Sequence, residues 1–123
     1  VNLYQGDLFA PLSGGKKYDL IISNPPYVAQ ESMGKLPPEY KSEPSVALLS
    51  SLAGLSHIKQ IVKSAKNHLS KDGLLVIEVG SANTHFESHF KELPYTWLHN
   101  SNSEKSVALI TSNDLNTVSS LPI

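Results

Sequence analysis

Two apolar runs separated by an amphipathic stretch dominate the chain. Residues 18–23 contain three consecutive aliphatic side chains, and residues 74–80 hold a second aliphatic run. Unbroken runs of this length are typical of strands that are buried on both faces of a sheet. Between them, apolar residues recur at helical spacing over residues 51–69. The pattern therefore predicts a β-α-β unit with a helix packed on two parallel, neighbouring strands.

Shorter elements are expected on either side of this unit. They are a strand over residues 1–4, a helix over 81–93, and strands over 95–99 and 106–111. Ser81 is the candidate N-cap of the second helix, and Phe86 and Phe90 are spaced to share one of its faces. A turn at residues 71–73 is expected to close the first helix.

The strand at residues 18–23 ends abruptly at Asn24-Pro25-Pro26-Tyr27. The prolines cannot donate to a sheet ladder, and Pro25 keeps Asn24 out of the helical conformation. Asn24 is therefore expected at the C-terminal end of a strand, which is where open α/β sheets bind ligands. Its carboxamide and nearby free carbonyls could grip a flat amide or amino group, with Tyr27 covering it. The alternative is an ordinary proline turn in which Asn24 bonds its own backbone.

A long proline-rich connection runs from Val28 to about Leu48. Connections of this length are uncommon unless they cover a site, so this segment is expected to lie over the substrate. It contains two acids, Glu39 and Glu43, which we interpret as surface or loop-anchoring residues rather than general bases.

The composition of the chain mainly rules out several classes of protein. The chain has 123 residues, 40% of them apolar and 17% charged, which fits one globular domain. Its net charge is -1, whereas proteins that bind nucleic acid mainly through the phosphates are basic, so a protein substrate is favoured. It contains no cysteine, and neither a signal segment nor a membrane-length apolar run is present, so a cytoplasmic protein with no membrane association is expected. His57 and His68 stand alone, and no metal site is predicted. Because the chain begins at Val1 in what reads as mid-domain, a fragment is expected.

The motif Asn24-Pro25-Pro26-Tyr27 after an apolar strand resembles the catalytic motif of class I methyltransferases that act on planar nitrogens. Residues 36–40, 43–44 and 47–48 resemble the stretch that follows this motif in the HemK-family protein glutamine-N5 methyltransferases. Residues 94–98, Pro-Tyr-Thr-Trp-Leu, are similar to the branch of that family that acts on ribosomal proteins. The resemblance covers about residues 2 to 115.

The resemblance implies an α/β fold, the C-terminal part of a Rossmann-like class I S-adenosylmethionine-dependent methyltransferase. Its sheet would be mostly parallel, in the order 3-2-1-4-5-7-6, with an antiparallel strand near the C-terminal edge. Residues 1–115 would form a partial catalytic domain with strands three to seven, and residues 116–123 would lie in a polar tail that is frayed from about Ser112. The glycine-rich cofactor turn after strand one has no counterpart in these residues.

The resemblance also implies roles for named residues. Asn24, Pro25, Pro26 and Tyr27 would be catalytic, and Asp7, Leu8 and Asn24 would contact S-adenosyl-L-methionine. From the residues alone, Asp7 is more simply a turn or cap residue. The implied substrate is a glutamine of a large-subunit ribosomal protein. The alternatives are a release factor, a nucleic-acid amino group (adenine N6 or guanine N2), or no activity in an inert fragment.

Two departures from the family pattern carry expectations of their own. Ser51 and Ala53 replace the first glycine and the aspartate of a Gly-x-Asp-Gly-Leu pattern, so a helix N-cap is expected to be lost. The absence of strands one and two leaves an apolar strand edge unpaired, which predicts self-association and weak cofactor binding by this polypeptide alone.

Overall fold

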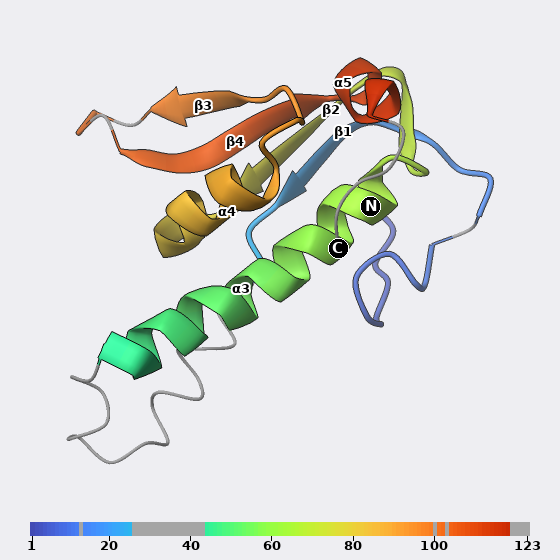
Figure 1. Cartoon of the computed structure of the whole chain (residues 1–123). Coiled ribbons are helices and arrows are strands. Elements are labelled where there is room, and N and C mark those ends of the chain that lie inside the picture. Colours follow the sequence, from blue (N-terminus) through green and yellow to red (C-terminus); the bar gives the residue numbers. More distant parts are fainter. Residues whose placement is uncertain (13, 26–43, 100, 103, 119–123) are drawn as a thin grey trace.

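Four strands form one mixed sheet in the computed structural model, which describes residues 1–12, 14–25, 44–99, 101–102 and 104–118, with side chains of the first helix described from residue 55 onward (Figure 1). With the labels of Figure 1, the elements are β1 (Tyr18–Ser23), α3 (Pro44–Ala65), β2 (Leu69–Glu78), the 3-10 helix η1 (Gly80–Ala82), α4 (Asn83–His89), β3 (Thr96–His99), β4 (Lys105–Thr111) and α5 (Ser112–Thr117).

The sheet has the order β1-β2-β4-β3. β1 and β2 are parallel and joined through α3, which confirms the predicted β-α-β unit. β4 is antiparallel to both of its neighbours, β2 and β3. The expected α/β architecture, with an antiparallel strand next to the C-terminal edge, is therefore present.

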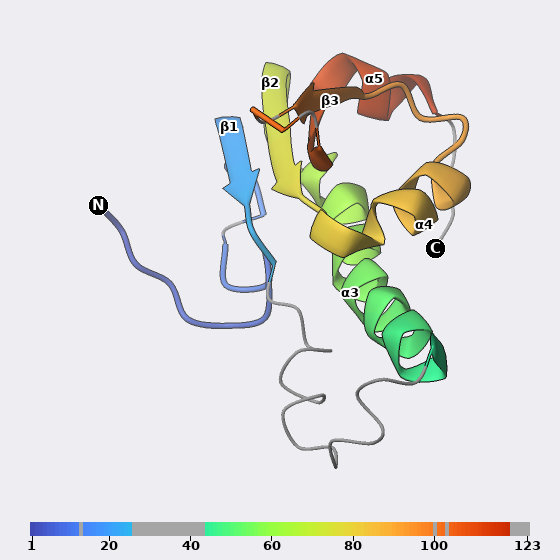
Figure 2. The same cartoon turned by 90° about the vertical axis from the view of Figure 1, so that its left-hand side faces the viewer.

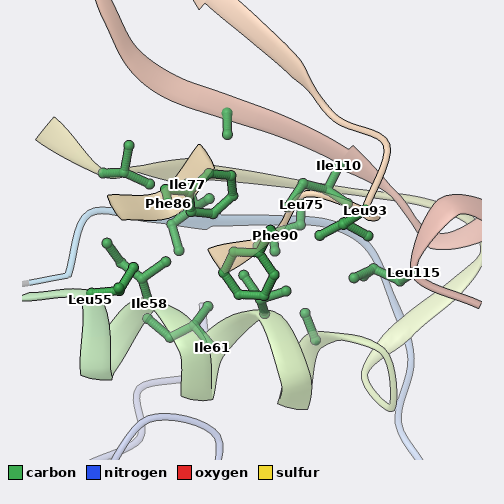
Figure 3. Packing of buried hydrophobic residues seen from close by; sticks show 14 of the residues in the cluster. Leu55, Ile58, Ile61, Leu75, Ile77, Phe86, Phe90, Leu93, Ile110 and Leu115 are labelled. Carbon is green, nitrogen blue, oxygen red and sulfur yellow. The ribbon is translucent and has the colours of Figure 1, made fainter. Parts of the chain in front are cut away.

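The helices α3 and α4 lie on the same side of the sheet (Figures 1 and 2). Leu55, Ile58 and Ile61 rise from α3 toward the sheet, where Leu75 and Ile77 of β2 meet them (Figure 3). Their aliphatic side chains make one contiguous hydrophobic core with Phe86 of α4 and with Phe90, which directly follows that helix. The residues that recur at helical spacing in the sequence are thus the ones that are buried. Burial of their apolar side chains stabilises the packing of the helix on the sheet.

The sequence predicted that β1 is buried on both faces, but the face that points away from α3 is exposed. Leu20 is 52% exposed and Ile22 is 70% exposed. The register places them beside Leu74 and Val76 of β2, on the side of the sheet away from α3. An aliphatic run indicates a strand, but it does not say whether both faces are covered.

The N-terminal prediction is also wrong, because residues 1–5 form no strand. Val1 and Leu3 are almost fully exposed, and Tyr4 is half exposed. In the expected order, strand three pairs only with strand two. Within the described residues no strand pairs with this segment, and ladder hydrogen bonds are what define a strand.

The boundaries of the β-α-β unit differ from those predicted. α3 begins at Pro44, not at residue 51, so Ser51 and Ala53 lie inside the helix and not at its N-terminus. The loss of an N-cap expected there does not apply. A proline is well suited to the first turn of a helix because the N–H that it lacks would be unpaired there.

The turn expected at residues 71–73 is not there: α3 ends at Ala65, the turn covers residues 66–68, and residues 71–73 belong to β2, which begins at Leu69. The register of β2 with β1 jumps from Tyr18↔Leu69 to Leu20↔Leu74, so the intervening residues bulge out of the ladder. Gly73 fits this place because a Cβ on it would lie 3.0 Å from the carbonyl oxygen of Tyr18.

The C-terminal segment is a helix and not a frayed tail from Ser112. Ser112 and Leu115 of α5 are buried, and the hydroxyl of Thr111 caps the helix by accepting a 3.0 Å hydrogen bond from the Asp114 backbone N–H. Burial of Leu115, packing of Val118 and the N-cap by Thr111 together hold a segment that is otherwise polar against the core.

The helix after β2 is shorter than the predicted span 81–93, because η1 precedes α4 and α4 ends at His89. Ser81 is not its N-cap, a position that Ala82 holds without a side-chain hydrogen bond. Phe86 and Phe90 do share a face, with ring centroids 4.8 Å apart.

Candidate active site

Asn24 directly follows the last residue of β1, so it stands at the C-terminal end of a strand that runs parallel to β2. Its side chain is exposed, whereas Pro25 is buried. The predicted arrangement, an outward carboxamide anchored by a proline that ends the strand, is therefore present. A carboxamide at this position can offer its donors and its acceptor to a ligand.

A tight turn over residues 6–12 lies close to this strand end. The N–H of Ala10 donates to the carbonyl of Asp7, and that of Leu12 donates to the carbonyl of Phe9, both at 2.9 Å. Leu8 has a φ of 50°, a left-handed conformation that costs a non-glycine residue roughly 1–3 kcal/mol. The cost is met by packing, since Leu8 is half-buried against the core.

Leu8 and Ser23 line the same cavity, of about 240 Å³. Ser23 immediately precedes Asn24 in the sequence, although Asn24 itself does not line the cavity. The remaining lining residues come from the N-terminal segment, β1 and α3, and most are apolar: Tyr4, Gly6, Phe9, Pro11, Leu12, Ile21, Ile22 and Ile61. A cavity with such walls suits a flat, weakly polar ring.

Asp7 does not line that cavity. A second hollow lies next to this cavity, and Leu8 and Phe9 line both of them. Asp7 lines only the second hollow, together with Lys63 and Asn67 near the end of α3. The structure thus brings Leu8 to the end of β1 and leaves Asp7 exposed in the turn. This placement agrees with the simpler interpretation of Asp7 as a turn residue.

Phe9 is a lining residue that the sequence argument missed. It borders both hollows and stacks on His68, with ring centroids 4.7 Å apart and an interplanar angle of 20°. His68 is fixed in turn because its Nδ1 lies 2.9 Å from the Ser64 carbonyl. The signal was the position of Phe9, which directly follows the two residues assigned to the cofactor.

Several predicted features lie outside the described residues. Pro26 and Tyr27, the second half of the motif, are among them, as are Glu39, Glu43 and most of the connection expected to cover the substrate. Only its last residues, 44–48, are described, and they belong to α3.

Within the described part of the chain, no group of three or more histidine, cysteine or acidic side chains is placed to hold a metal ion. Among the same residues, no helix is long and apolar enough to cross a membrane.

Comparison with curated proteins gives consistent relatives. The chain is 45% identical over 115 residues to a ribosomal protein uL3 glutamine methyltransferase of Bradyrhizobium diazoefficiens. It is 43% identical over 117 residues to the protein of the same name from Bordetella pertussis, and 44% identical over 115 residues to that from Neisseria gonorrhoeae. These matches cover 94–95% of the chain.

The chain is homologous to the ribosomal protein uL3 glutamine methyltransferases. It spans 36–39% of the length of these three relatives. No protein-family model matches the chain, and no solved structure matches it. The mixed sheet and α/β layering fit a class I methyltransferase, as does homology to uL3 glutamine methyltransferases. Relatives with this name imply a methyl donor as co-substrate.

Proposed function

We propose that these residues form part of a class I, S-adenosylmethionine-dependent enzyme that methylates the N5 side-chain nitrogen of a glutamine in a large-subunit ribosomal protein. The observation that carries the proposal is the place of Asn24, exposed at the end of β1 directly after Ser23, which lines a cavity together with Leu8. The name shared by relatives at 43–45% identity supports the choice of substrate. A cytoplasmic location follows from that substrate.

The strand order supports the Rossmann-like assignment. Read as strands four, five, seven and six, the order β1-β2-β4-β3 matches the second half of the order 3-2-1-4-5-7-6. In this assignment β1 is strand four, and its C-terminal end is the ligand-binding end of the sheet.

The role that we assign to this chain is to position the substrate amide against the methyl donor. The carboxamide oxygen of Asn24 and the backbone carbonyl of Pro25 would accept hydrogen bonds from the two N–H groups of the substrate amide. Holding both N–H groups fixes the plane of the amide and directs its nitrogen lone pair toward the methyl donor. Pro26 would stiffen this turn, and Tyr27 would pack over the amide.

S-adenosylmethionine supplies an electrophilic methyl group on a sulfonium. The apolar cavity that Leu8 lines would take the adenine ring of such a group, with Asn24 as the polar side chain next to its lining residue Ser23 in sequence. The position of Asp7 outside this cavity does not support the contact with the cofactor that the resemblance implied. The amide nitrogen gains a methyl group and loses a proton. Alignment of two reactants can lower a barrier by about 7–11 kcal/mol.

A chimera tests the proposal. Residues 1–115 replace the matching segment of the Bradyrhizobium diazoefficiens relative, and transfer of labelled methyl is measured to undermethylated ribosomal proteins, release factors and RNA. Label on the large-subunit protein is expected. It should fall about a hundredfold with Asn24→Ala, because the amide loses its acceptor and its alignment.

The matched control is Asn113→Ala, which removes an exposed carboxamide from α5, far along the chain from the site. It should transfer methyl as the unmodified chimera does. Label on release factors or RNA would assign the chain to one of the other substrate classes. No label, from a chimera that folds, would contradict the enzymatic proposal.

A further inference from the structure

The two parallel strands β1 and β2 end side by side, at the end of the sheet where Asn24 stands (Figure 2). The last pair in their register is Ser23 of β1 beside Ile77 of β2. Asn24 is held extended because a proline follows it, so it continues the line of the strand by one residue. Its neighbour on β2 is therefore Glu78, the last residue of that strand.

Asn24 and Glu78 also lie on the same face of the sheet. Ile22 and Asn24 are exposed, and Ser23 between them is half-buried. In β2, Glu78 is half-buried, whereas Ile77 before it is fully buried in the core. Because side chains alternate between the two faces of a strand, Asn24 and Glu78 both point away from α3. Neighbouring strands are about 4.8 Å apart, so a glutamate side chain can reach the carboxamide.

Besides Asn24, the sheet neighbours of Glu78 on this face are apolar. Val107 of β4 stands opposite Glu78 in the register, and Val76 precedes it on the same face of β2. Lys105, a cation at the start of β4, directs its ammonium to a carboxylate of α4 at 3.4 Å. A charge on an aliphatic surface is screened less than a charge in water, so it acts strongly on polar neighbours. Asn24 is the polar side chain that this charge meets across the strands.

We propose that Glu78 is a positioning residue that orients the carboxamide of Asn24. A carboxamide can be turned end for end, because its oxygen and its NH2 group have nearly the same shape, yet only the oxygen accepts hydrogen bonds. The carboxylate of Glu78 attracts the NH2 group, so the oxygen is turned away from β2. This inference rests on the proposed function, which needs that oxygen as the acceptor of a substrate N–H.

The direction that Glu78 gives to the oxygen agrees with the proposed strand order. In that order β2 is strand five, and strand one lies on the other side of β1, where the order of the strands reverses. Ligands of open α/β sheets bind at this reversal, so the methyl donor and the substrate amide would meet there. An oxygen turned away from β2 faces them, whereas an NH2 group in its place could not accept a hydrogen bond from the substrate.

Kinetics of the chimera described above test this role. Glu78→Gln keeps the size of the side chain and removes its charge, so the carboxamide of Asn24 is no longer held in one orientation. We expect kcat for methyl transfer to fall about tenfold with KM for S-adenosylmethionine unchanged, because alignment is lost and cofactor binding is not. Glu92→Gln, which removes an exposed carboxylate after α4, should leave kcat unchanged. An unchanged kcat in Glu78→Gln would contradict the role of Glu78.

A double-mutant cycle separates the orientation of Asn24 from a direct role of Glu78 in the reaction. If Glu78 acts through Asn24, adding Glu78→Gln to Asn24→Ala should reduce kcat no further. A further loss would mean that Glu78 contacts the substrate or supports the fold by itself, and it would overturn the positioning role. Circular dichroism and urea unfolding check that each variant is folded.

A measurement without catalysis separates this inference from the proposed function. In amide NMR spectra of the chimera, the side-chain NH2 signal of Asn24 is identified by its disappearance in Asn24→Ala. Glu78→Gln should shift this signal, because the charge that faces the NH2 group is gone, and Glu92→Gln should not. A shift in a chimera that transfers no methyl would support the orientation by Glu78 and refute the proposed function alone. An unshifted signal would overturn the orientation, even in an active chimera.

Discussion

The indole N–H of Trp97 donates a 3.0 Å hydrogen bond to Oε1 of Glu87. The ammonium of Lys105 lies 3.4 Å from the same oxygen, so one carboxylate joins β3 and β4 to α4. Tyr95 packs edge-on against Trp97, with ring centroids 5.4 Å apart. Burial, and secondly the negative charge of Glu87, raise the pKa of Tyr95 above its usual value.

We expect Glu87→Gln to lower the pKa of Tyr95 toward, but not fully to, its usual value. The change removes the charge that opposes phenolate formation and leaves the burial. The phenolate absorbance, followed against pH and compared with Tyr95→Phe to isolate this tyrosine, measures the shift. Glu92→Gln, which alters an exposed carboxylate just after α4, should leave the titration unchanged.

The same group makes stability depend on alkaline pH. A tyrosine whose pKa is raised by folding contributes stability that is fully present below the pKa of the unfolded chain. That contribution is lost as the pH rises through the folded pKa. Urea unfolding at increasing alkaline pH should show a smaller loss for Tyr95→Phe, and equal losses would contradict the assignment.

Gly73→Ala should destabilise the fold by about 1–3 kcal/mol, because overpacking forces the backbone to shift. The new Cβ would lie 3.0 Å from the Tyr18 carbonyl oxygen and 3.0 Å from Cδ2 of Leu69. Gly14→Ala is the control, since nothing lies within 4 Å of its Cβ position. Chemical denaturation measures both, and equal stabilities would show that the β2 bulge can move aside.

Thr111→Val should cost about 1 kcal/mol of stability, because it keeps the shape of the side chain but removes the acceptor of the Asp114 N–H. The loss should appear as faster hydrogen exchange within α5. Thr96→Val, at an exposed position of β3, serves as the control. Unchanged exchange would mean that burial of Leu115 alone holds α5 in place.

The 123-residue chain alone should bind S-adenosylmethionine weakly or not at all. It contains no Gly-x-Gly-x-x-Gly turn to hold the methionine end of the cofactor. Isothermal titration of the chain and of the chimera described above would separate a missing cofactor site from a misfolded one. A micromolar dissociation constant for the chain alone would contradict this prediction.

The pattern of apolar residues correctly predicted the helices and strands that pack against one another within this chain. The aliphatic runs at β1 and β2 and the helical spacing of Leu55, Ile58 and Ile61 gave the parallel pair and its covering helix. Phe86 and Phe90 were placed on one face for the same reason. Each of these predictions depends on periodicity, which follows directly from backbone geometry.

Two of the predictions that failed depended on partners that the sequence pattern does not specify. A strand was expected over residues 1–4, but no neighbouring strand of the described chain pairs with it. Leu20 and Ile22 look like core residues in sequence, and only the register and the position of β1 at the edge show their exposure. At the candidate site, the place of Asn24 could be predicted because proline chemistry is local. The separation of Asp7 from Leu8 could not, because it depends on the left-handed turn at Leu8.

The contacts that start β1 beside β2 have a kinetic consequence. Lys17 Nζ donates to the Asn67 carbonyl at 2.6 Å, and Ser70 Oγ donates to Asp19 Oδ1 at 2.7 Å, across 50 and 51 residues of sequence. Each contact requires a loop of that length to close before it stabilises anything. The segment from α4 to α5 has much shorter separations and should therefore form first. We therefore expect β1 to join the sheet late in folding, with its aliphatic side chains the last to be covered.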